Sequence, residues 1–321
     1  MEKRLSVVVP CFNEADVLAR TYARLREALA GEGDALELVF VDDGSTDGTW
    51  EKLRELARAD ARIVAVRLSR NFGHQYALSA GLDLASGEHV AVIDADLQDP
   101  PELLPRMLAL AREGNDVVYG QRLARDGETA FKRLSADLFY RVLSRLSDTD
   151  IPRDAGDFRV MSRRVVALLK DMPERDRFVR GMVSWLGFRQ AAVQYDREAR
   201  AGGASKYSFA HMIRLALTGI SSFSIAPLRA CIYLSYLLFA LSLVGIAYTI
   251  YAWYVLDVVR GWTSVTVLVM FLGGCNLFFT GVLGEYVGKT YFQTKMRPLY
   301  VVDEVLRAGE PASLRPGRGS R

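Results

Sequence analysis

This chain of 321 residues contains only three cysteines, and its formal net charge is only +3. Cys11, Cys231 and Cys275 lie in apolar surroundings and form no metal-ligand spacing. This excludes a disulfide framework and predicts small core residues in a reducing compartment. So small a net charge gives no argument for nucleic-acid binding. A signal peptide is not expected, because Met1 to Arg4 lead directly into a predicted strand.

Charged residues are missing from two stretches in the last third of the chain. Residues 230–256 and 261–284 contain no Asp, Glu, Lys or Arg. Each stretch is long enough to cross a hydrocarbon core as a helix, so the sequence predicts two transmembrane helices. A pair of helices buried in a soluble domain is the alternative, although such helices normally carry a polar face.

Basic residues lie outside both charge-free stretches. Those before the first are Lys206, Arg214 and Arg229, and those after the second are Lys289, Lys295 and Arg297. The connection at residues 257–260 carries one arginine. The positive-inside rule therefore predicts both termini in the cytoplasm and the connection outside. Residues 207–228 are mildly amphipathic and predict interfacial helices, with a simple linker helix as the alternative.

The part of the chain before residue 207 alternates strand-like and helix-like segments. We expect strands at 5–9, 36–41, 63–68, 90–93 and 116–119, and helices at 15–30, 46–59, 74–85 and 101–112. This alternation predicts an α/β fold with a mainly parallel sheet between two helical layers. The predicted organisation is a catalytic domain at 1–206, interfacial helices at 207–228, two transmembrane helices at 229–285 and a cytoplasmic tail at 286–321.

Polar loops follow the first, second and fourth predicted strands, at residues 10–14, 42–47 and 94–101. The carboxyl ends of parallel strands share one edge of a sheet, where open α/β sheets bind ligands. We therefore expect the three loops to converge. Ser45 and Thr46 are predicted to be helix caps.

Asp94 and Asp96 stand one residue apart at the end of the fourth predicted strand, closely followed by Gln98. Two carboxylates so close repel each other unless a cation lies between them, and a divalent cation shared with substrate phosphates is the usual solution. The alternative is a pair of solvated aspartates in a turn.

Six motifs carry a resemblance to a known family. They are Val-Val-Pro-Cys-Phe-Asn-Glu (8–14), Val-Asp-Asp-Gly-Ser-Thr-Asp (41–47), Arg-Asn-Phe-Gly-His-Gln-Tyr-Ala (70–77), Asp-Ala-Asp-Leu-Gln-Asp-Pro-Pro (94–101), Asp-Ala-Gly-Asp-Phe-Arg (154–159) and Ser-Lys-Tyr (205–207). On these motifs the sequence resembles family 2 glycosyltransferases with the Rossmann-like GT-A fold. The closest resemblance is to the polyprenyl-phosphate glycosyltransferases, which include bactoprenol glucosyltransferases and dolichol-phosphate mannose synthase. One departure is Phe12, where the family commonly has Tyr; the stacking ring is kept.

The resemblance implies an inverting transfer of a sugar from a nucleotide-sugar to undecaprenyl (polyprenyl) phosphate, with Mg²⁺ or Mn²⁺ as cofactor. The product would be a polyprenyl-linked sugar for cell-envelope glycans. It further implies a multi-pass protein of the bacterial inner (cytoplasmic) membrane, with the catalytic domain in the cytoplasm. UDP-glucose is the expected donor. UDP-4-deoxy-4-formamido-arabinose, UDP-N-acetylglucosamine and GDP-mannose stay open, as does a homo-oligomer.

The resemblance also implies roles for individual residues. The metal would be held by Asp96 and Gln98, with Asp94 close by. The nucleotide-sugar would be held by Pro10, Phe12, Glu14, Asp42 and Asp94. The acceptor phosphate would be held by Arg122, Arg133 and Lys206, for which a solvated surface charge is the alternative. The catalytic residues would be Asp157, Asp96 and Asp94.

Asp157 occupies the position of the family's proposed catalytic base. A phosphate monoester is already largely dianionic at neutral pH and hardly needs a base. Asp157 is therefore either a proton acceptor for the monoanionic fraction or a residue that orients Arg159.

Three other functions fit the sequence less well. A processive polysaccharide synthase usually needs a Gln-x-x-Arg-Trp motif and more spans, and a nucleotidyltransferase would favour a Gly-rich, Lys-bearing first loop. Neither feature is present. A catalytically silent membrane scaffold would not need Asp94, Asp96 and Gln98.

Overall fold

The computed structural model describes residues 4–123, 155–175, 177–196, 226–255 and 261–307. These residues divide into two compact units. One unit combines the described residues up to 196 with residues 296–307, and the other contains 226–255 and 261–295.

The first unit is built on a sheet with the strand order β7–β5–β6–β4–β1–β2–β3–β8 among the described residues. The strands are β1 (Leu5–Cys11), β2 (Leu36–Asp42), β3 (Ile63–Leu68), β4 (His89–Val92), β5 (Val117–Arg122), β6 (Ala155–Ser162), β7 (Gln190–Tyr195) and β8 (Val302–Arg307). The predicted parallel core is present, because β4, β1, β2 and β3 run parallel. The sheet as a whole is mixed, because β6 runs antiparallel between β4 and β5 and β8 runs antiparallel to β3.

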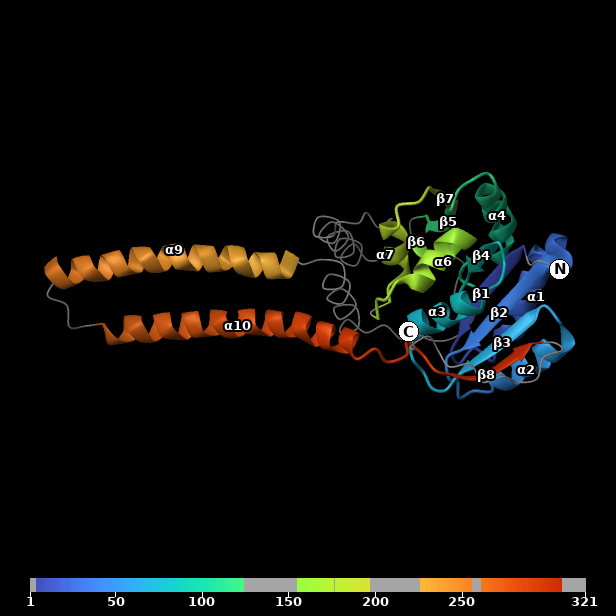
Figure 1. The fold of residues 1–321 in the computed structure, drawn as a ribbon, viewed down its shortest axis with the longest axis horizontal. Helices are drawn as coiled ribbons and strands as arrows, with labels where there is room; N and C mark the ends of the chain where they lie inside the picture. Colours follow the sequence, from blue (N-terminus) through green and yellow to red (C-terminus); the bar gives the residue numbers. More distant parts are fainter. Residues whose placement is uncertain (1–3, 124–154, 176, 197–225, 256–260, 308–321) are drawn as a thin grey trace. The chain divides into compact units, whose positions relative to one another are not determined.

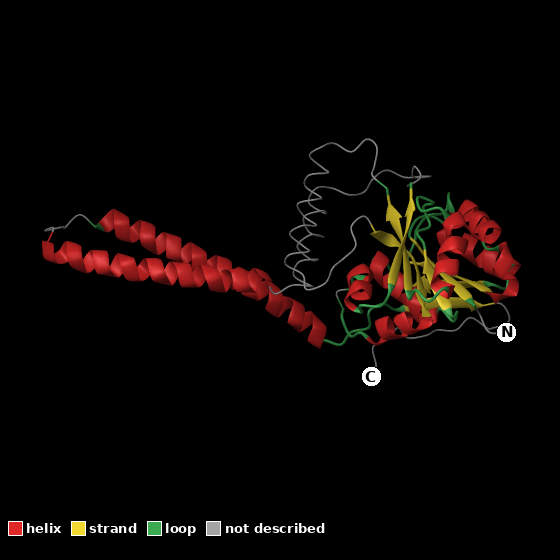
Figure 2. Cartoon of the chain, turned by 90° about the horizontal axis from the view of Figure 1, so that it is seen from above, coloured by secondary structure: helices red, strands yellow, loops and turns green. Residues whose placement is uncertain are grey.

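Helices cover both faces of this sheet, as predicted (Figures 1 and 2). The α-helices of this unit are α1 (Leu18–Ala28), α2 (Thr49–Ala59), α3 (His74–Leu84), α4 (Leu104–Arg112), α6 (Arg163–Asp171) and α7 (Val179–Trp185); two short 3-10 helices are η1 (Ala30–Ala35) and η2 (Pro101–Leu103). One layer contains α3, α6 and α7, and the other contains α1, α2 and α4. Every residue of β1 and β2 is buried, as expected for central strands covered on both faces.

Gly81 lets α3 lie unusually close to the sheet. A Cβ atom at this position would stand 2.2 Å from Val8 Cγ1 and 3.2 Å from Val41 Cγ2. Because α3 begins where β3 has just ended, this close packing holds His74 and Gln75, its first residues, at the carboxyl edge of the sheet.

The strand β8 comes from the segment predicted to be a cytoplasmic tail. Val302 and Val305 are buried against the edge strand β3. The residues just before β8 are also fixed, since Tyr300 Oη donates to Asp83 Oδ2 at 2.6 Å and Ser69 N donates to the Val301 carbonyl at 3.0 Å. Residues far along the chain therefore complete the sheet of the first unit.

The second unit contains two long helices, α9 (Ala226–Val255) and α10 (Trp262–Thr294), which lie side by side (Figures 1 and 2). Large apolar side chains on their surface are exposed, among them Ile232, Tyr233, Leu237, Val244, Leu268, Leu277 and Phe278. Within the residues that the structure describes, no helix meets the combined demands of length and apolarity for crossing a membrane. The two predicted transmembrane helices are thus not confirmed.

Candidate functional site

The loops after β1 and β2 are bound to each other by side chain-to-backbone hydrogen bonds. Asn13 N donates to Ser45 Oγ at 2.9 Å, and Thr46 N donates back to Asn13 Oδ1 at 2.8 Å. The prediction that Ser45 and Thr46 cap a helix is wrong, because α2 begins only at Thr49 and its N-cap position is Gly48. These polar side chains instead hold the two loops together.

The residues predicted to hold the nucleoside lie on these two loops. The Phe12 ring is 38% exposed and can stack on a base. Pro10 is buried within β1 and Glu14 is half-buried. Asp42 is fully buried; its Oδ1 accepts from Ser45 N at 3.2 Å, and its Oδ2 has no hydrogen-bond partner among the described residues. Burial raises the pKa of Asp42, as expected for a carboxyl group short of partners.

Asp43 fixes the loop that leads into α3, a role that the sequence did not indicate. Its carboxylate accepts from Phe72 N at 2.8 Å and from Gly73 N at 2.9 Å. Gly44 beside it has a φ of +68°, and a Cβ there would lie 2.5 Å from the Arg70 carbonyl carbon. Only glycine fits this position without moving the loop.

Strand pairing brings Asp94 and Asp157 together. Val92 of β4 pairs with Arg159 of the antiparallel strand β6. Asp94 stands two residues beyond Val92, just after β4 ends, and Asp157 stands two residues before Arg159 within β6, so the two aspartates lie close together at this edge of the sheet. The predicted catalytic aspartates thus lie at one edge of the sheet, although they are far apart in sequence.

His74 joins the two aspartates. Its Nε2 lies 3.3 Å from Asp157 Oδ2 and 3.5 Å from Asp94 Oδ1. Burial by itself would lower the pKa of His74, but the contact with Asp157 and the charge of Asp94 raise it to about 9. The motif at residues 70–77 contained this histidine, yet nothing in the sequence showed which side chains it would meet.

Asp157 is surrounded by hydrogen-bond donors. Gln75 Nε2 donates to its Oδ2 at 3.0 Å, and Arg180 and Arg159 lie 3.6 and 4.0 Å from its Oδ1. Burial alone would raise the pKa of Asp157, but the bond from His74 and the charges of Arg180 and Arg159 outweigh burial and hold it well below its usual range. Gln75 and Arg180 were not identified from the sequence.

The residues predicted to hold a metal have suitable oxygen atoms. Asp94 Oδ1 accepts no hydrogen bond within the described residues, and burial raises the pKa of Asp94 to about 6, which indicates an under-compensated carboxylate. Asp96 is buried and its Oδ1 accepts from Gln98 N at 3.2 Å. No group of three or more His, Cys, Asp or Glu side chains in the described ranges converges on a metal position. The pair fits a cation that takes its remaining ligands from substrate phosphates.

Arg122 ends β5 and is already bound to protein side chains. Its Nε donates to Tyr195 Oη at 3.2 Å, and its guanidinium lies 3.4 Å from Asp99 Oδ1. A Cβ at Gly156 would stand 2.7 Å from the Arg122 guanidinium, so Arg122 packs directly beside the start of β6. Its assignment to the acceptor phosphate stays a prediction. Arg133 and Lys206 lie outside the described residues.

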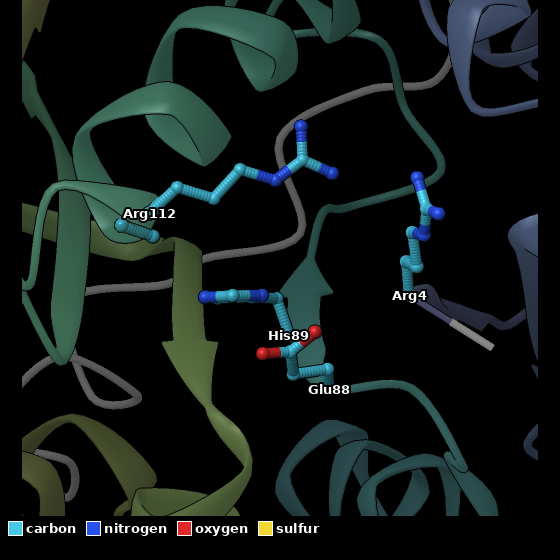
Figure 3. A pocket seen from close by; sticks show the side chains of 5 residues that line it. Arg4, Glu88, His89 and Arg112 are labelled. Carbon is cyan, nitrogen blue, oxygen red and sulfur yellow. The ribbon is translucent and has the colours of Figure 1, made fainter. Parts of the chain in front are cut away.

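A separate pocket of about 490 Å³ lies at the opposite edge of the sheet (Figure 3). It is lined by Arg4, Glu88, His89, Ala111 and Arg112, around the starts of β1 and β4. Because the aspartates stand at the other ends of these strands, this pocket is not part of the candidate site.

Comparison with known families gives two matches. Residues 6–169 match the family model described as Glycosyl transferase family 2. Residues 226–290, which contain α9 and most of α10, match the model of the GtrB C-terminal hairpin. The first match and the mixed α/β sheet confirm the predicted GT-A-like fold of the catalytic part.

Several curated proteins are similar over nearly the whole chain. An uncharacterized glycosyltransferase of Bacillus subtilis, YkcC, is 44% identical over 300 residues, covering 93% of each chain. A prophage bactoprenol glucosyl transferase homolog of Escherichia coli is 40% identical over 94% of this chain and 99% of its own. The bactoprenol glucosyl transferase of Shigella phage SfX is 40% identical over 93% and 98%. The resemblance read from the sequence motifs is confirmed.

Solved structures are more distant. A mannosyltransferase from Pyrobaculum calidifontis, in complex with GDP-Man and Mn²⁺, has a TM-score of 0.46 and 22% identity, covering 68% of this chain and 61% of its own. Glucosyl-3-phosphoglycerate synthase from Mycobacterium tuberculosis, with Mn²⁺, UDP and phosphoglyceric acid, has the same TM-score of 0.46 and identity of 22%, covering 68% and 76%.

Proposed function

The chain belongs to glycosyl transferase family 2, and from this premise we propose that it transfers a sugar from a nucleotide-sugar to the phosphate of a membrane polyprenol. The observation that carries the proposal is the extent of the likeness to bactoprenol glucosyl transferases. It runs through both the catalytic sheet and the C-terminal hairpin at 40% identity. An enzyme that shared only the catalytic chemistry would not need to match in the hairpin.

The site supports transfer chemistry rather than a silent scaffold. Its carboxylates are at least half-buried and are held by specific partners at the ligand-binding edge of the sheet. A scaffold gains nothing from placing the half-buried carboxylates of Asp94 and Asp157 close together, because like charges shielded from solvent destabilise a fold.

We infer that a divalent cation, Mg²⁺ or Mn²⁺, belongs to the working enzyme. Asp96 and Asp94 would hold it, with Gln98 beside them. Such a cation supplies charge stabilisation to a departing nucleoside diphosphate. The protein's own part is to fix the two carboxylates: Asp94 stands two residues after the end of β4, and the backbone N–H of Gln98 donates to Asp96 Oδ1.

We propose that Asp157 positions its neighbours rather than accepting a proton. The carboxylate faces His74, Gln75 and Arg180, each of which favours its ionised form. A carboxylate stabilised in this way is a weak base. A phosphate acceptor hardly needs a general base, because its second pKa lies near 6 and it is largely dianionic at neutral pH.

The donor proposed first is UDP-glucose, because the relatives that carry a substrate in their names are glucosyl transferases. UDP-4-deoxy-4-formamido-arabinose, UDP-N-acetylglucosamine and GDP-mannose are the other candidates. Phe12 supports a nucleotide donor of either base, because an exposed ring stacks on purines and pyrimidines alike.

We also propose that α9 and α10 form a membrane hairpin and that catalysis occurs at the cytoplasmic face of the bacterial inner membrane. Three observations support this: the match to a hairpin model, the two charge-free stretches and the exposed apolar side chains of the two helices. Exposed apolar surface of this extent is typical of a membrane or protein contact.

A screen of nucleotide-sugars tests the proposal directly. The purified full-length protein is incubated with undecaprenyl phosphate and each labelled donor, with and without Mg²⁺ or Mn²⁺, and lipid-linked sugar is measured. We expect transfer from UDP-glucose. Transfer from another donor alone would replace the proposed sugar. If no donor gives a lipid-linked product, the polyprenyl phosphate acceptor is wrong.

A further inference from the structure

Asp157 has more positive charge beside it than its own carboxylate can balance. The buried guanidinium of Arg159 and the partly buried guanidinium of Arg180 both face its Oδ1. Neither arginine forms an ion pair with another acidic side chain in the described part of the chain. Two guanidinium groups beside one carboxylate leave one positive charge uncompensated, and such a site favours an additional anion.

The two arginines differ in how their donors are used. Arg159 is 3% exposed, and its guanidinium donates to the carbonyls of Gly156 at 2.8 Å and Asp157 at 3.3 Å. Arg180 is 23% exposed, and its ion pair in the described part of the chain is the 3.6 Å contact with Asp157, while its buried Nε finds no acceptor within the described residues. A guanidinium carries five N–H donors, so Arg180 keeps several of them for a ligand.

Arg180 is also held in place before any ligand arrives. Gln75 accepts from Val179 N at 2.9 Å and donates to Asp157 at 3.0 Å, so it ties the first residue of α7 to the aspartate. The guanidinium carbon of Arg180 lies 5.7 Å from the centre of the Phe178 ring. A guanidinium fixed in this way loses less conformational entropy when it binds an anion.

We propose that Arg180 binds the phosphate of the polyprenyl acceptor and holds it beside Asp157. This inference rests on the proposed function. In an inverting transfer the attacking phosphate and the leaving diphosphate lie on opposite sides of the sugar. Asp94 and Asp96 are assigned to the diphosphate side, which leaves the neighbouring strand β6 and helix α7 for the acceptor. Planar guanidinium groups match phosphate oxygens by paired hydrogen bonds, which the ammonium of lysine cannot reproduce.

Substitution of Arg180 tests the assignment. Arg180→Gln removes the charge, and Arg180→Lys keeps the charge but loses the fork of donors. Arg58→Gln, on the exposed surface of α2, is the matched control. For each protein we measure the KM for undecaprenyl phosphate, the KM for the nucleotide-sugar, donor hydrolysis without acceptor, and thermal unfolding.

In Arg180→Gln we expect the KM for the lipid phosphate to rise by about tenfold or more, as for loss of hydrogen bonds to a charged group. Arg180→Lys should show a smaller rise. Donor KM and donor hydrolysis should stay close to wild type in both variants. A merely structural role would instead lower unfolding temperature and change both KM values together. If Arg180→Gln does not fold, Arg180→Lys tests the assignment instead: its KM for the lipid phosphate should rise while its KM for the nucleotide-sugar does not.

Two results would overturn the assignment while leaving the proposed function intact. A rise in donor KM alone would move Arg180 to the diphosphate, and unchanged KM values in a folded variant would remove it from both phosphates. A wild-type protein that hydrolyses nucleotide-sugar but never glycosylates the lipid would instead refute the proposed function, and the acceptor role of Arg180 with it.

Discussion

At the scale of the residue, the surroundings of Asp157 decide what its carboxylate can do. Donors from α3, α7 and its own strand approach it, and each of them stabilises the negative charge. The likeness of the sequence motif left proton transfer and positioning both open. The contacts favour positioning, because a base must be able to accept a proton near neutral pH.

Asp157→Asn separates the two roles. The substitution keeps the shape of the side chain but removes the charge that faces Arg159 and Arg180. We expect kcat to fall by about tenfold or more. The loss should be the same across pH 6 to 9, because a residue that only positions its neighbours takes no proton during the reaction. Partial recovery at high pH, where more acceptor is dianionic, would instead indicate a base. An unchanged kcat would contradict both roles.

Asp96→Asn tests the proposed cation. The amide keeps one oxygen but loses the negative charge, so transfer should fall by about a hundredfold or more while the protein stays folded. Excess chelator should reproduce the loss in the wild type. Asp303→Asn, on the exposed side of β8, is the control and should keep full activity. Undiminished transfer in Asp96→Asn, or in chelator, would rule out a cation at this position.

His89 makes stability depend on pH at the other edge of the sheet. The side chain is buried beside Glu88, Arg112, Arg4 and Glu32, and burial lowers its pKa despite Glu88 (Figure 3). The unfolded chain therefore binds more protons below its pKa of about 6.5, so stability should be lost as pH falls below that value. His89→Asn should reduce the drop in melting temperature between pH 7.5 and 5.5. An identical drop in the variant would exclude His89 as the cause.

The sequence predicted some residues of the site but not the contacts that others make. Asp94 and Asp96 were expected at the sheet edge that carries the other polar loops, because strand ends converge in any α/β sheet, whereas Asp157 was named from the motif alone and only the pairing of β6 with β4 places it beside them. His74, Gln75 and Arg180 were missed, because their roles depend on how α3 and α7 pack against β6. Gln75 and Asp157 are 82 residues apart in the sequence, so no local sequence pattern predicts their contact.

At the scale of the element, the predicted parallel strands were confirmed because continuous β-branched runs mark buried central strands. The antiparallel strands were not predicted. The strand β8 is the instructive case, because its Val-Asp-Glu-Val-Leu-Arg sequence contains too many charges to suggest a strand without its partner. Its pairing with β3 spans most of the chain, and only the folded structure shows it.

Val305→Ala tests whether β8 belongs to the catalytic core. Val305 is 4% exposed, whereas Val301 just before the strand is 42% exposed. Removing two buried methyl groups should cost about 2 kcal/mol of unfolding free energy, and the same change at Val301 much less. Thermal unfolding of the purified variants measures the difference. Equal effects at the two positions would mean that β8 contributes no buried packing.

At the scale of the whole molecule, the chain passes from the catalytic sheet into the hairpin and back to β8 in the same sheet. If the hairpin spans the membrane, both ends of the catalytic unit must lie on one side of it. The orientation proposed from the basic residues around the charge-free stretches puts that side in the cytoplasm. The nucleotide-sugar pool of the cell lies there too, so topology and the proposed donor depend on each other.

Cysteine labelling in intact cells tests this orientation. The background carries Cys231→Ser and Cys275→Ser, while Cys11 is 2% exposed and can stay. A cysteine introduced by Gly261→Cys, next to the connection between the helices, should react with a membrane-impermeant thiol reagent. One introduced by Ser313→Cys should react only after the membrane is permeabilised, because the positive-inside rule keeps the C-terminal segment in the cytoplasm. The unsubstituted background gives the baseline for both. The reverse pattern would place the catalytic sheet outside the cell, where a cytosolic nucleotide-sugar could not reach Asp94 and Asp96, and the proposed reaction would lose its donor.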